Sequence, residues 1–245
     1  MWRILVTIPV ALGIVAAPLS VCHASAGSSS TSFYDTFNGK SGSAPPSNLT
    51  QETGYGQRAF GNGEKETYTT SRSNSYQDGH GDLVIKAVRA NNGTWTSARL
   101  TTQNSLTQAQ GTFSADIKFP DTTGMWPAFW LLSTNSKNES DIAEIYGNHK
   151  WPDGVTVHSV GGDDATARIS PPGTGWNTWS EVWNSSKIKF YEDGRLLFST
   201  DTPADFTGQK MYLILNLAVG GSGGGAIPSS TSTMTMLVKW ISVKK

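Results

Sequence analysis

Three carboxylates stand within six residues of this 245-residue chain: Glu139, Asp141 and Glu144. Side chains of a β-strand alternate between its two faces, so Glu139 and Asp141 point to the same side. Strict alternation would turn Glu144 to the opposite side. One extra residue after Asp141, a β-bulge, returns Glu144 to the side of the other two. We therefore predict that the spacing E-x-D-x-x-E is a bulged strand that presents three acids to one surface.

Glycoside hydrolysis is a reaction that needs such a cluster. A retaining enzyme places two carboxyl groups about 5–5.5 Å apart, one as nucleophile and one as acid/base. Because the bulge adds one residue without adding length, Glu139 and Glu144 are four strand positions apart, which separates their backbones by roughly 13 Å. The two side chains therefore have to lean together across a concave sheet. Asp141 between them can hold the proton that keeps the pair in different states. The spacing alone also fits a solvated acidic loop or a cation-binding loop.

Two tryptophans, Trp126 and Trp130, precede the acids in the apolar run WPAFWLL. A pyranose ring has apolar C–H faces, and an indole offers a flat surface for them. We predict that both tryptophans line a cleft beside the acids and bind substrate. Packing in the hydrophobic core is the alternative for each of them.

The elements that position these residues are short apolar stretches between Gly- and Pro-containing turns. No stretch has a sustained 3.6-residue apolar period, so we predict an all-β domain, a sandwich or barrel. The segment 51–75 is polar and Gly-rich and is predicted as long loops, and Asp193-Gly194 is a hairpin signal. The predicted strands cover residues 33–37, 83–89, 97–102, 111–119, 125–132, 139–144, 154–160, 179–183, 188–192, 196–200, 211–219 and 234–243.

The order of these motifs resembles glycoside hydrolase family 16, in its laminarinase-type branch with the bulged E-x-D-x-x-E. The resemblance runs from about residue 33 to residue 243 and implies a concanavalin-like β-jelly-roll sandwich with a concave substrate cleft. Besides WPAFWLL and the acids, it rests on FYDTFNG (33–39), GNGE (61–64), GDLVIKA (81–87), SARLTT (97–102), KIKFYEDG (187–194) and YLILNLAVGG (212–221).

The resemblance implies a role for each acid. Glu139 is the expected nucleophile, Glu144 the general acid/base and Asp141 the assisting carboxylate. Such a reaction needs no cofactor.

Further residues match positions at which the family binds substrate. Asn62, Glu64 and Arg99 fall where the family places polar contacts to sugar hydroxyls, although Arg99 also suits a structural ion pair. His158, on the strand after the acids, matches a position beside the cleft and is expected to bind substrate. Asn216 matches the family too, where its role is either in the cleft or toward the backbone.

The chain also departs from the family. Ser140 stands where the back face of the acidic strand is usually apolar. Family members often hold a structural calcium between two acids, and Lys239 and Thr36 occupy those places here, so we predict no metal. A short glycine-rich stretch, 222–225, replaces a longer tryptophan-rich segment, which leaves substrate preference open.

Residues 1–26 have the features of a signal peptide, followed by one catalytic domain, 27–245. Arg3 gives a positive start, 4–17 is apolar, and Ala24-Ser25-Ala26 is a small-residue cleavage site. The preceding Cys22, the only cysteine, suggests lipid anchoring as an alternative, but Val21 is bulky for that signal. We expect a secreted or periplasmic protein whose mature chain has neither a disulfide nor a thiol nucleophile.

Charge and composition exclude other classes of function. Nineteen basic and nineteen acidic residues balance, without a basic run, which argues against nucleic acid and, after signal cleavage, against membranes. We therefore predict a monomeric, secreted, retaining endo-β-glycosidase whose partner is a polysaccharide, β-1,3-glucan or mixed β-1,3/1,4-glucan. The alternatives are the same chemistry on a galactan or a bacterial exopolysaccharide, and a non-catalytic lectin-like domain. A polysaccharide lyase would need a basic cleft, which the composition does not favour.

Overall fold

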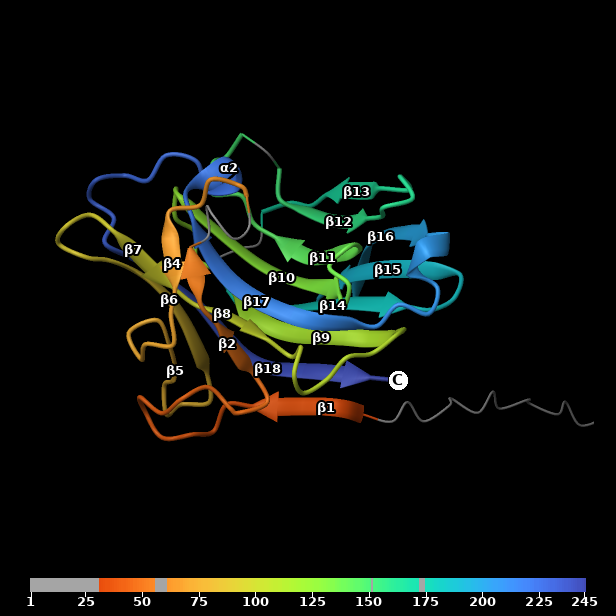
Figure 1. Cartoon of the computed structure of the whole chain (residues 1–245), viewed down its shortest axis with the longest axis horizontal. Coiled ribbons are helices and arrows are strands. Elements are labelled where there is room, and N and C mark those ends of the chain that lie inside the picture. Colours follow the sequence, from red (N-terminus) through yellow and green to blue (C-terminus); the bar gives the residue numbers. More distant parts are fainter. Residues whose placement is uncertain (1–30, 56–60, 151, 172–174) are drawn as a thin grey trace, which may run out of the picture.

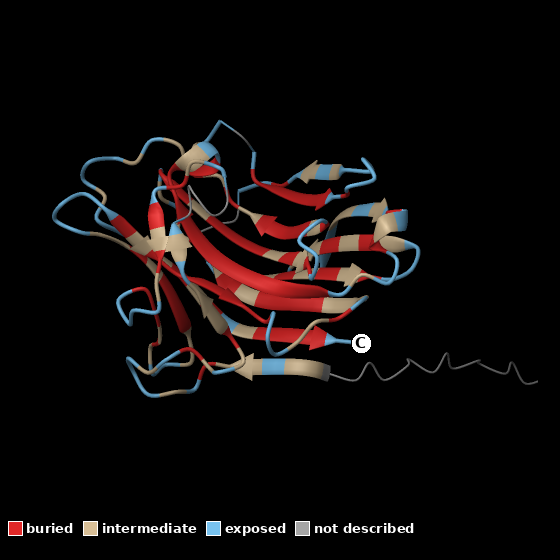
Figure 2. Ribbon diagram, in the orientation of Figure 1, coloured by how far each residue is buried: buried red, intermediate tan, exposed pale blue. Residues whose placement is uncertain are grey.

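The computed structural model describes residues 31–55, 61–150, 152–171 and 175–245. Two large β-sheets face each other across a hydrophobic core (Figures 1 and 2), as predicted for an all-β sandwich. Within these ranges, no helix has both the length and the apolar character of a membrane span. The predicted signal peptide, including Cys22, lies outside the described residues.

The inner sheet has seven strands, and every neighbouring pair in it is antiparallel. It carries the acidic strand, the tryptophans and most of the other candidate residues. Its order is β13 (Ala165–Arg168), β12 (Gly154–His158), β11 (Glu139–Glu144), β10 (Met125–Ser133), β17 (Met211–Val219), β8 (Arg99–Thr101) and β2 (Thr50–Glu52).

The outer sheet has eleven strands. Its main path is β16 (Arg195–Asp201), β15 (Lys187–Glu192), β14 (Asn177–Trp183), β9 (Gly111–Lys118), β18 (Thr233–Lys244), β6 (Leu83–Arg89), β7 (Trp95–Ser97), β4 (Glu66–Tyr68) and β3 (Gly54–Tyr55). Off this path, β1 (Thr31–Thr36) pairs with β18 and β5 (Ser75–Gln77) pairs with β6. Two short helical segments complete the described fold, η1 (Ala204–Phe206) and α2 (Gly221–Gly224).

The core explains the apolar patterns. All nine residues of β17 are buried, because this strand runs through the middle of the inner sheet, with the core on one side and the cleft on the other. On β14, the alternate residues Trp179 and Trp183 are fully buried and point between the sheets. The Trp183 ring meets Phe206 of η1 edge to face, with centroids 5.8 Å apart.

Some local predictions need correction. The predicted strand 97–102 is divided at Ala98, where the chain passes from β7 in the outer sheet to β8 in the inner sheet. The described part of the segment 51–75 overlaps four short strands, β2 to β5, each of which has too few residues to show a periodic pattern. β13 was not predicted, for the same reason. The hairpin signal is confirmed: Asp193 and Gly194 join β15 to β16 with φ of 49° and 77°, as a type I′ turn requires.

Candidate active site

The acidic strand β11 contains the predicted bulge. Against β12, Asp141 lies opposite Thr156 and Glu144 lies opposite Gly154, so three steps on β11 match two on its neighbour. The register against β10 shifts at the same place. Ile142 and Ala143 are fully buried on the core side. The bulge therefore turns Glu144 toward the side of Glu139 and Asp141, as the spacing predicted.

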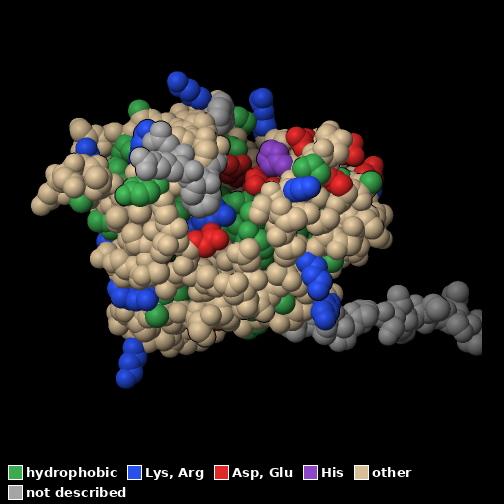
Figure 3. Space-filling model, viewed as in Figure 1, with side chains coloured by type: hydrophobic (Ala, Val, Ile, Leu, Met, Phe, Trp, Pro, Cys, Tyr) green, Lys and Arg blue, Asp and Glu red, His purple; other side chains and the backbone are tan. Residues whose placement is uncertain are grey.

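All three acids line one open cavity of about 530 Å³ over the inner sheet. Figure 3 shows this hollowed face, with acidic and histidine side chains gathered on it. The cavity brings together most of the predicted site residues: Glu139, Asp141, Glu144, Trp126, Trp130, Arg99, Asn62 and Glu64. It is also lined by residues that were not predicted, among them Glu52, Tyr68, Gln103 and Tyr212.

Glu144 is held at both of its carboxyl oxygens. The indole Nε1 of Trp126 donates a hydrogen bond of 2.8 Å to Oε1, and the Tyr146 hydroxyl donates to Oε2. Burial raises the pKa of Glu144, whereas these two hydrogen bonds, together with the charge of His158, lower it. The carboxyl is thereby fixed in orientation, with its proton affinity raised less than burial alone would raise it.

Trp126 in turn is fixed by the glycine-rich turn α2. A Cβ atom on Gly223 would lie 2.3 Å from the Trp126 ring, so only glycine lets this backbone rest against the indole. The Tyr146 ring also packs near the indole, with 6.0 Å between the ring centroids. Trp126 was predicted as a substrate-binding residue; it lines the cavity and also positions Glu144.

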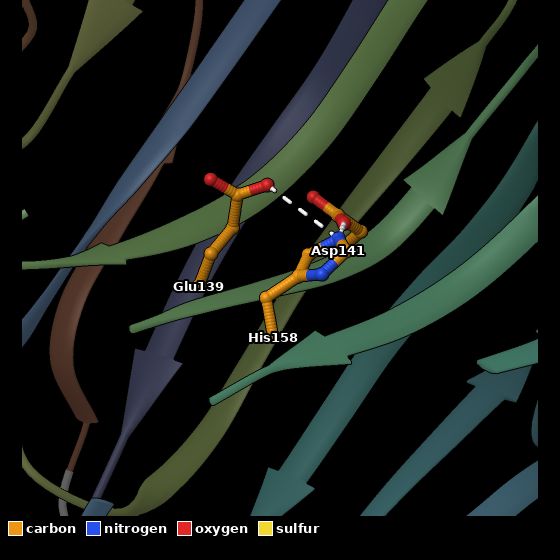
Figure 4. A group of neighbouring side chains, drawn as sticks. All are labelled: Glu139, Asp141 and His158. Carbon is orange, nitrogen blue, oxygen red and sulfur yellow. Dashed lines mark ion pairs between the residues drawn. The ribbon is translucent and has the colours of Figure 1, made fainter. Parts of the chain in front are cut away.

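Glu139, Asp141 and His158 form a compact group on neighbouring strands (Figure 4). The Nε2 atom of His158 is 3.4 Å from Asp141 Oδ2 and 4.0 Å from Glu139 Oε1. Burial, and then the charge of Asp141, raise the pKa of Glu139 to about 8, against the lowering effect of His158. Burial also raises the pKa of Asp141 well above its usual range, with the charge of Glu144 adding to it. Protons therefore stay on this cluster at neutral pH.

Among the described residues, the same group offers donor atoms that could hold a metal ion, with one atom of each residue within 4.8 Å of the others. Two carboxylates and an imidazole are donors that zinc and similar ions accept. Glu139 and Asp141 belong to the acid cluster of the cavity, however, and glycoside hydrolysis by a carboxyl pair uses no metal. The absence of a metal requirement stays a prediction.

Behind the acids, Ser140 has a partner between the two sheets. Its Oγ donates a hydrogen bond of 2.5 Å to Glu181, a fully buried carboxyl on β14 of the outer sheet. Burial raises the pKa of Glu181 to about 8, although the hydrogen bond from Ser140 lowers it. The charge of Glu181 also raises the pKa of Asp141. The polar residue at position 140 therefore links the acidic strand to a buried, proton-binding side chain.

Trp130 and Arg99 lie together in another part of the cavity. The Trp130 Nε1 atom donates to Asn216 Oδ1 at 2.8 Å, and Asn216 Nδ2 donates to the Tyr68 hydroxyl at 3.2 Å. Arg99 forms an ion pair with Glu52, and its guanidinium carbon is 4.7 Å from the Trp130 ring centroid. Arg99 thus has a structural ion pair, which was one of its two predicted roles. The side-chain amide of Asn216 forms hydrogen bonds with Trp130 and Tyr68, which line the cleft.

The remaining predicted binding residues differ in their positions. Glu64 is buried, and one of its carboxyl oxygens accepts a hydrogen bond of 3.1 Å from the backbone N–H of Asn62. His158 contacts the acids but is not among the residues that line the cavity, and 49% of its side chain is exposed. His158 therefore lies at the edge of the cavity. Tyr146 was missed, although its place two residues after Glu144 would have put it on the same face of an extended chain.

Elsewhere on the sandwich, the ammonium of Lys239 has its own partners. It lies 3.7 Å from an Asp116 oxygen and 4.0 Å from the centroid of the Trp176 ring. A cation and an aromatic face attract each other at this distance. The residue that replaces a family acid therefore supplies a positive charge beside Asp116.

Comparisons with known proteins agree with this geometry. The model of glycosyl hydrolases family 16 matches residues 61–242. The endo-1,3-1,4-β-glycanase ExsH of Rhizobium meliloti is 32% identical over 186 residues, which cover 66% of this chain but 39% of that protein's length.

Two solved structures extend the comparison. The laminarinase catalytic domain of Thermotoga maritima superposes with a TM-score of 0.76 at 26% identity, covering 89% of this chain and 98% of that one. A Mycobacterium tuberculosis protein described as an immunostimulatory antigen and pseudo β-1,3-glucanase has a TM-score of 0.75 at 32% identity, covering 86% and 97%. From its motifs, its bulged acidic strand and these matches, the chain belongs to glycosyl hydrolases family 16.

Proposed function

We propose that this protein is a secreted, retaining endo-β-glycosidase that cleaves β-1,3-glucan or mixed β-1,3/1,4-glucan by double displacement. The observation that carries the proposal is the common orientation of Glu139, Asp141 and Glu144 toward one open cavity. An open cleft lets a polymer pass through, which suits cleavage within a chain. The names of the relatives in R. meliloti and T. maritima support the choice of a β-glucan.

In the first step, the Glu139 carboxylate attacks the anomeric carbon while Glu144 gives its proton to the leaving glycosidic oxygen. A covalent glycosyl-enzyme results, and the shortened chain leaves as an alcohol. In the second step, Glu144, now a carboxylate, takes a proton from water, whose oxygen displaces Glu139. Two inversions at the same carbon retain its configuration.

Charge within the cluster decides which groups carry protons. Asp141, with its strongly raised pKa, holds a proton and so removes one of three adjacent negative charges. Because the pKa of Glu139 is about 8, this carboxyl has to lose its proton before it attacks, and the charge of a protonated His158 favours that ionisation. The indole of Trp126 is a donor only and keeps Oε1 of Glu144 occupied. Because the Tyr146 hydroxyl at Oε2 can either donate or accept, whereas the indole at Oε1 can only donate, Oε2 is the oxygen better suited to carry the proton that moves to the substrate.

Carbohydrate binding without hydrolysis is the second candidate. It is favoured by the M. tuberculosis relative, whose description as a pseudo β-1,3-glucanase is attached to a protein 32% identical to this chain. The complete acid trio favours hydrolysis over this alternative.

A panel of soluble β-glucans, galactans and bacterial exopolysaccharides, with product size measured by chromatography, tests the proposal. We expect short oligosaccharides from a β-1,3-linked or mixed-linkage glucan, and no product from the Glu139→Ala variant. If only a galactan gave product, the substrate would be a galactan and not a β-glucan. Binding to glucan with no product from any polymer would overturn hydrolysis in favour of the second candidate.

Secretion has its own test. We expect the exported protein to begin near residue 27, which mass spectrometry of the N-terminus determines. A diacylated Cys22 at the N-terminus would show lipid anchoring instead.

A further inference from the structure

A row of side chains crosses the outer face of the outer sheet, on the side opposite the acids. Tyr34 of β1 lies opposite Ser242 of β18, Ser242 opposite Ser114 of β9, Ser114 opposite Ser180 of β14, and Ser180 opposite Tyr191 of β15. We call these five residues the serine row. They point away from the core, because their strand neighbours are buried on the other face: Phe113, Ala115, Trp179, Glu181, Phe190, Ile241 and Val243.

Part of the serine row forms a cavity of about 410 Å³. Three hydroxyl residues, Thr112, Ser114 and Ser242, line it together with Tyr34, Trp240 and Lys244. The small serines between larger neighbours make the sheet surface hollow at this place. Tyr34 is 59% exposed at one end of the row.

The hollow contains a polar atom without a partner. Ser242 is 5% exposed, and its Oγ is buried with no hydrogen-bond partner among the described residues. A buried hydroxyl is normally hydrogen-bonded, since leaving it unpaired is unfavourable. A hydroxyl group that enters the hollow can satisfy it once a neighbouring side chain such as the exposed Tyr34 turns aside.

Exposed apolar side chains mark both ends of the row. Large hydrophobic side chains that are strongly exposed number four among the described residues: Tyr34, Tyr55, Val160 and Leu196. Tyr34 begins the row, and Leu196 of β16 lies opposite Tyr191 at its other end. Two of the four therefore lie on one line across six strands, with hydroxyl groups between them.

We propose that the serine row is a second binding site for a neutral β-glucan chain. Tyrosine and tryptophan rings suit the C–H faces of sugar rings, and serine hydroxyls both donate and accept hydrogen bonds to sugar hydroxyls. The five residues of the row are uncharged, and the one charged side chain that lines the hollow is Lys244. Four strand spacings from β1 to β15 give a length of about 19 Å, enough for a short oligosaccharide. The identity of the sugar rests on the proposed function.

A site on the face opposite the cleft changes how the protein acts on particles. Two weak sites on one molecule raise the local concentration of polymer at the cleft without any new contact there. The second site is therefore expected to matter for insoluble glucan and to have no effect on short soluble oligosaccharides.

The test uses two variants of the full chain. One combines Tyr34→Ala and Trp240→Ala, and the other is Ser242→Val, which replaces the hydroxyl in the hollow by a methyl group on a residue suited to a strand. Tyr76→Ala, at a half-buried tyrosine on β5 outside the row, is the matched control. Sedimentation with insoluble β-1,3-glucan measures binding in a Glu139→Gln background, which prevents turnover. Hydrolysis of insoluble glucan and of a soluble oligosaccharide is measured in the active background.

We expect Ser242→Val to bind insoluble glucan about 5-fold more weakly, as the loss of one hydroxyl contact implies, and the double variant, which loses two aromatic contacts, to bind at least about 5-fold more weakly. Both variants should hydrolyse insoluble glucan correspondingly more slowly. Both variants should keep the wild-type rate on the oligosaccharide and the wild-type melting temperature. The Tyr76→Ala control should match the wild type in binding, in both rates and in melting temperature. If Ser242→Val keeps wild-type binding while folded, the inference is wrong, whether or not the double variant folds. If the wild type hydrolyses no glucan but binding still depends on the row, the proposed function fails and this site stands.

Discussion

The indole Nε1 of Trp126 donates a hydrogen bond of 2.8 Å to Oε1 of Glu144. The second tryptophan of the same strand, Trp130, donates instead to Asn216. Two tryptophans four residues apart therefore have different tasks: one holds the carboxyl of Glu144, and the other belongs to a hydrogen-bonded chain that leads through Asn216 to Tyr68.

Trp126→Phe is expected to lower kcat about 10- to 100-fold, since a hydrogen bond to a charged group contributes about 1.5–3 kcal/mol. Because this bond lowers the pKa of Glu144, its loss raises that pKa and moves the basic limb of the kcat/KM profile to higher pH. Trp130→Phe is the matched control and should leave the basic limb in place. An unmoved limb in Trp126→Phe would contradict the positioning role.

His158→Gln is expected to move both limbs of the kcat/KM profile to higher pH. The charge of His158 lowers the pKa of Glu139 and of Glu144, so both carboxyls bind protons more tightly without it. His149→Gln, which removes a histidine that contacts Thr123 outside the acid cluster, serves as the control. A profile that keeps its position, or moves to lower pH, would show that His158 does not act on the acids through its charge.

The protein is expected to be more stable at pH 5 than at pH 8. Burial raises the pKa of Glu66 to about 7, and that of Glu139 and Glu181 to about 8. A carboxyl whose pKa is raised by folding stabilises the protein below its unfolded pKa of 4.5, and this contribution is lost as pH rises toward 8. Each such group changes the free energy of unfolding by at most about 1.4 kcal/mol per pH unit.

Glu181→Gln isolates one of these groups. The amide can still accept the hydrogen bond from Ser140 but does not titrate, so the melting temperature of the variant should fall less between pH 5 and pH 8. Thermal melts at a series of pH values measure the difference. Parallel curves for the variant and the wild type would mean that Glu181 has the same pKa in the folded and unfolded chain.

A chelator is expected to change neither the melting temperature nor the rate of hydrolysis. The ammonium of Lys239 lies beside Asp116, where it opposes the binding of a cation. In the proposed mechanism, the acids of the cavity use protons and not a metal. A lower melting temperature or a lower rate in chelator, restored by calcium or zinc, would show that a metal is required.

Sequence reasoning reached the parts of the fold that depend on local pattern. The alternation along β6 and the apolar run of β17 predicted these strands to the residue. The extra residue after Asp141 predicted the bulge, because three acids on one face required it. Asp193-Gly194 predicted a tight turn, since both positions need positive φ.

Contacts between distant segments were beyond such reasoning. Glu181 has no local feature that marks it as the partner of Ser140, because the two meet only when the sheets pack together. Gly223 looks like part of a loop in sequence, and its role depends on the indole that rests against it. The division at Ala98 depends on the separation of the two sheets and not on the pattern of residues 97–102.

The most direct test of the central claim is to trap the glycosyl-enzyme. A 2-deoxy-2-fluoro-β-glucosyl substrate with a good leaving group slows the second step, and mass spectrometry of the digested protein locates the attached sugar. We predict one sugar adduct per chain, on the peptide that contains Glu139 and absent from Glu139→Ala. An adduct on a different carboxyl, while the wild type remains active on glucan, would contradict the account.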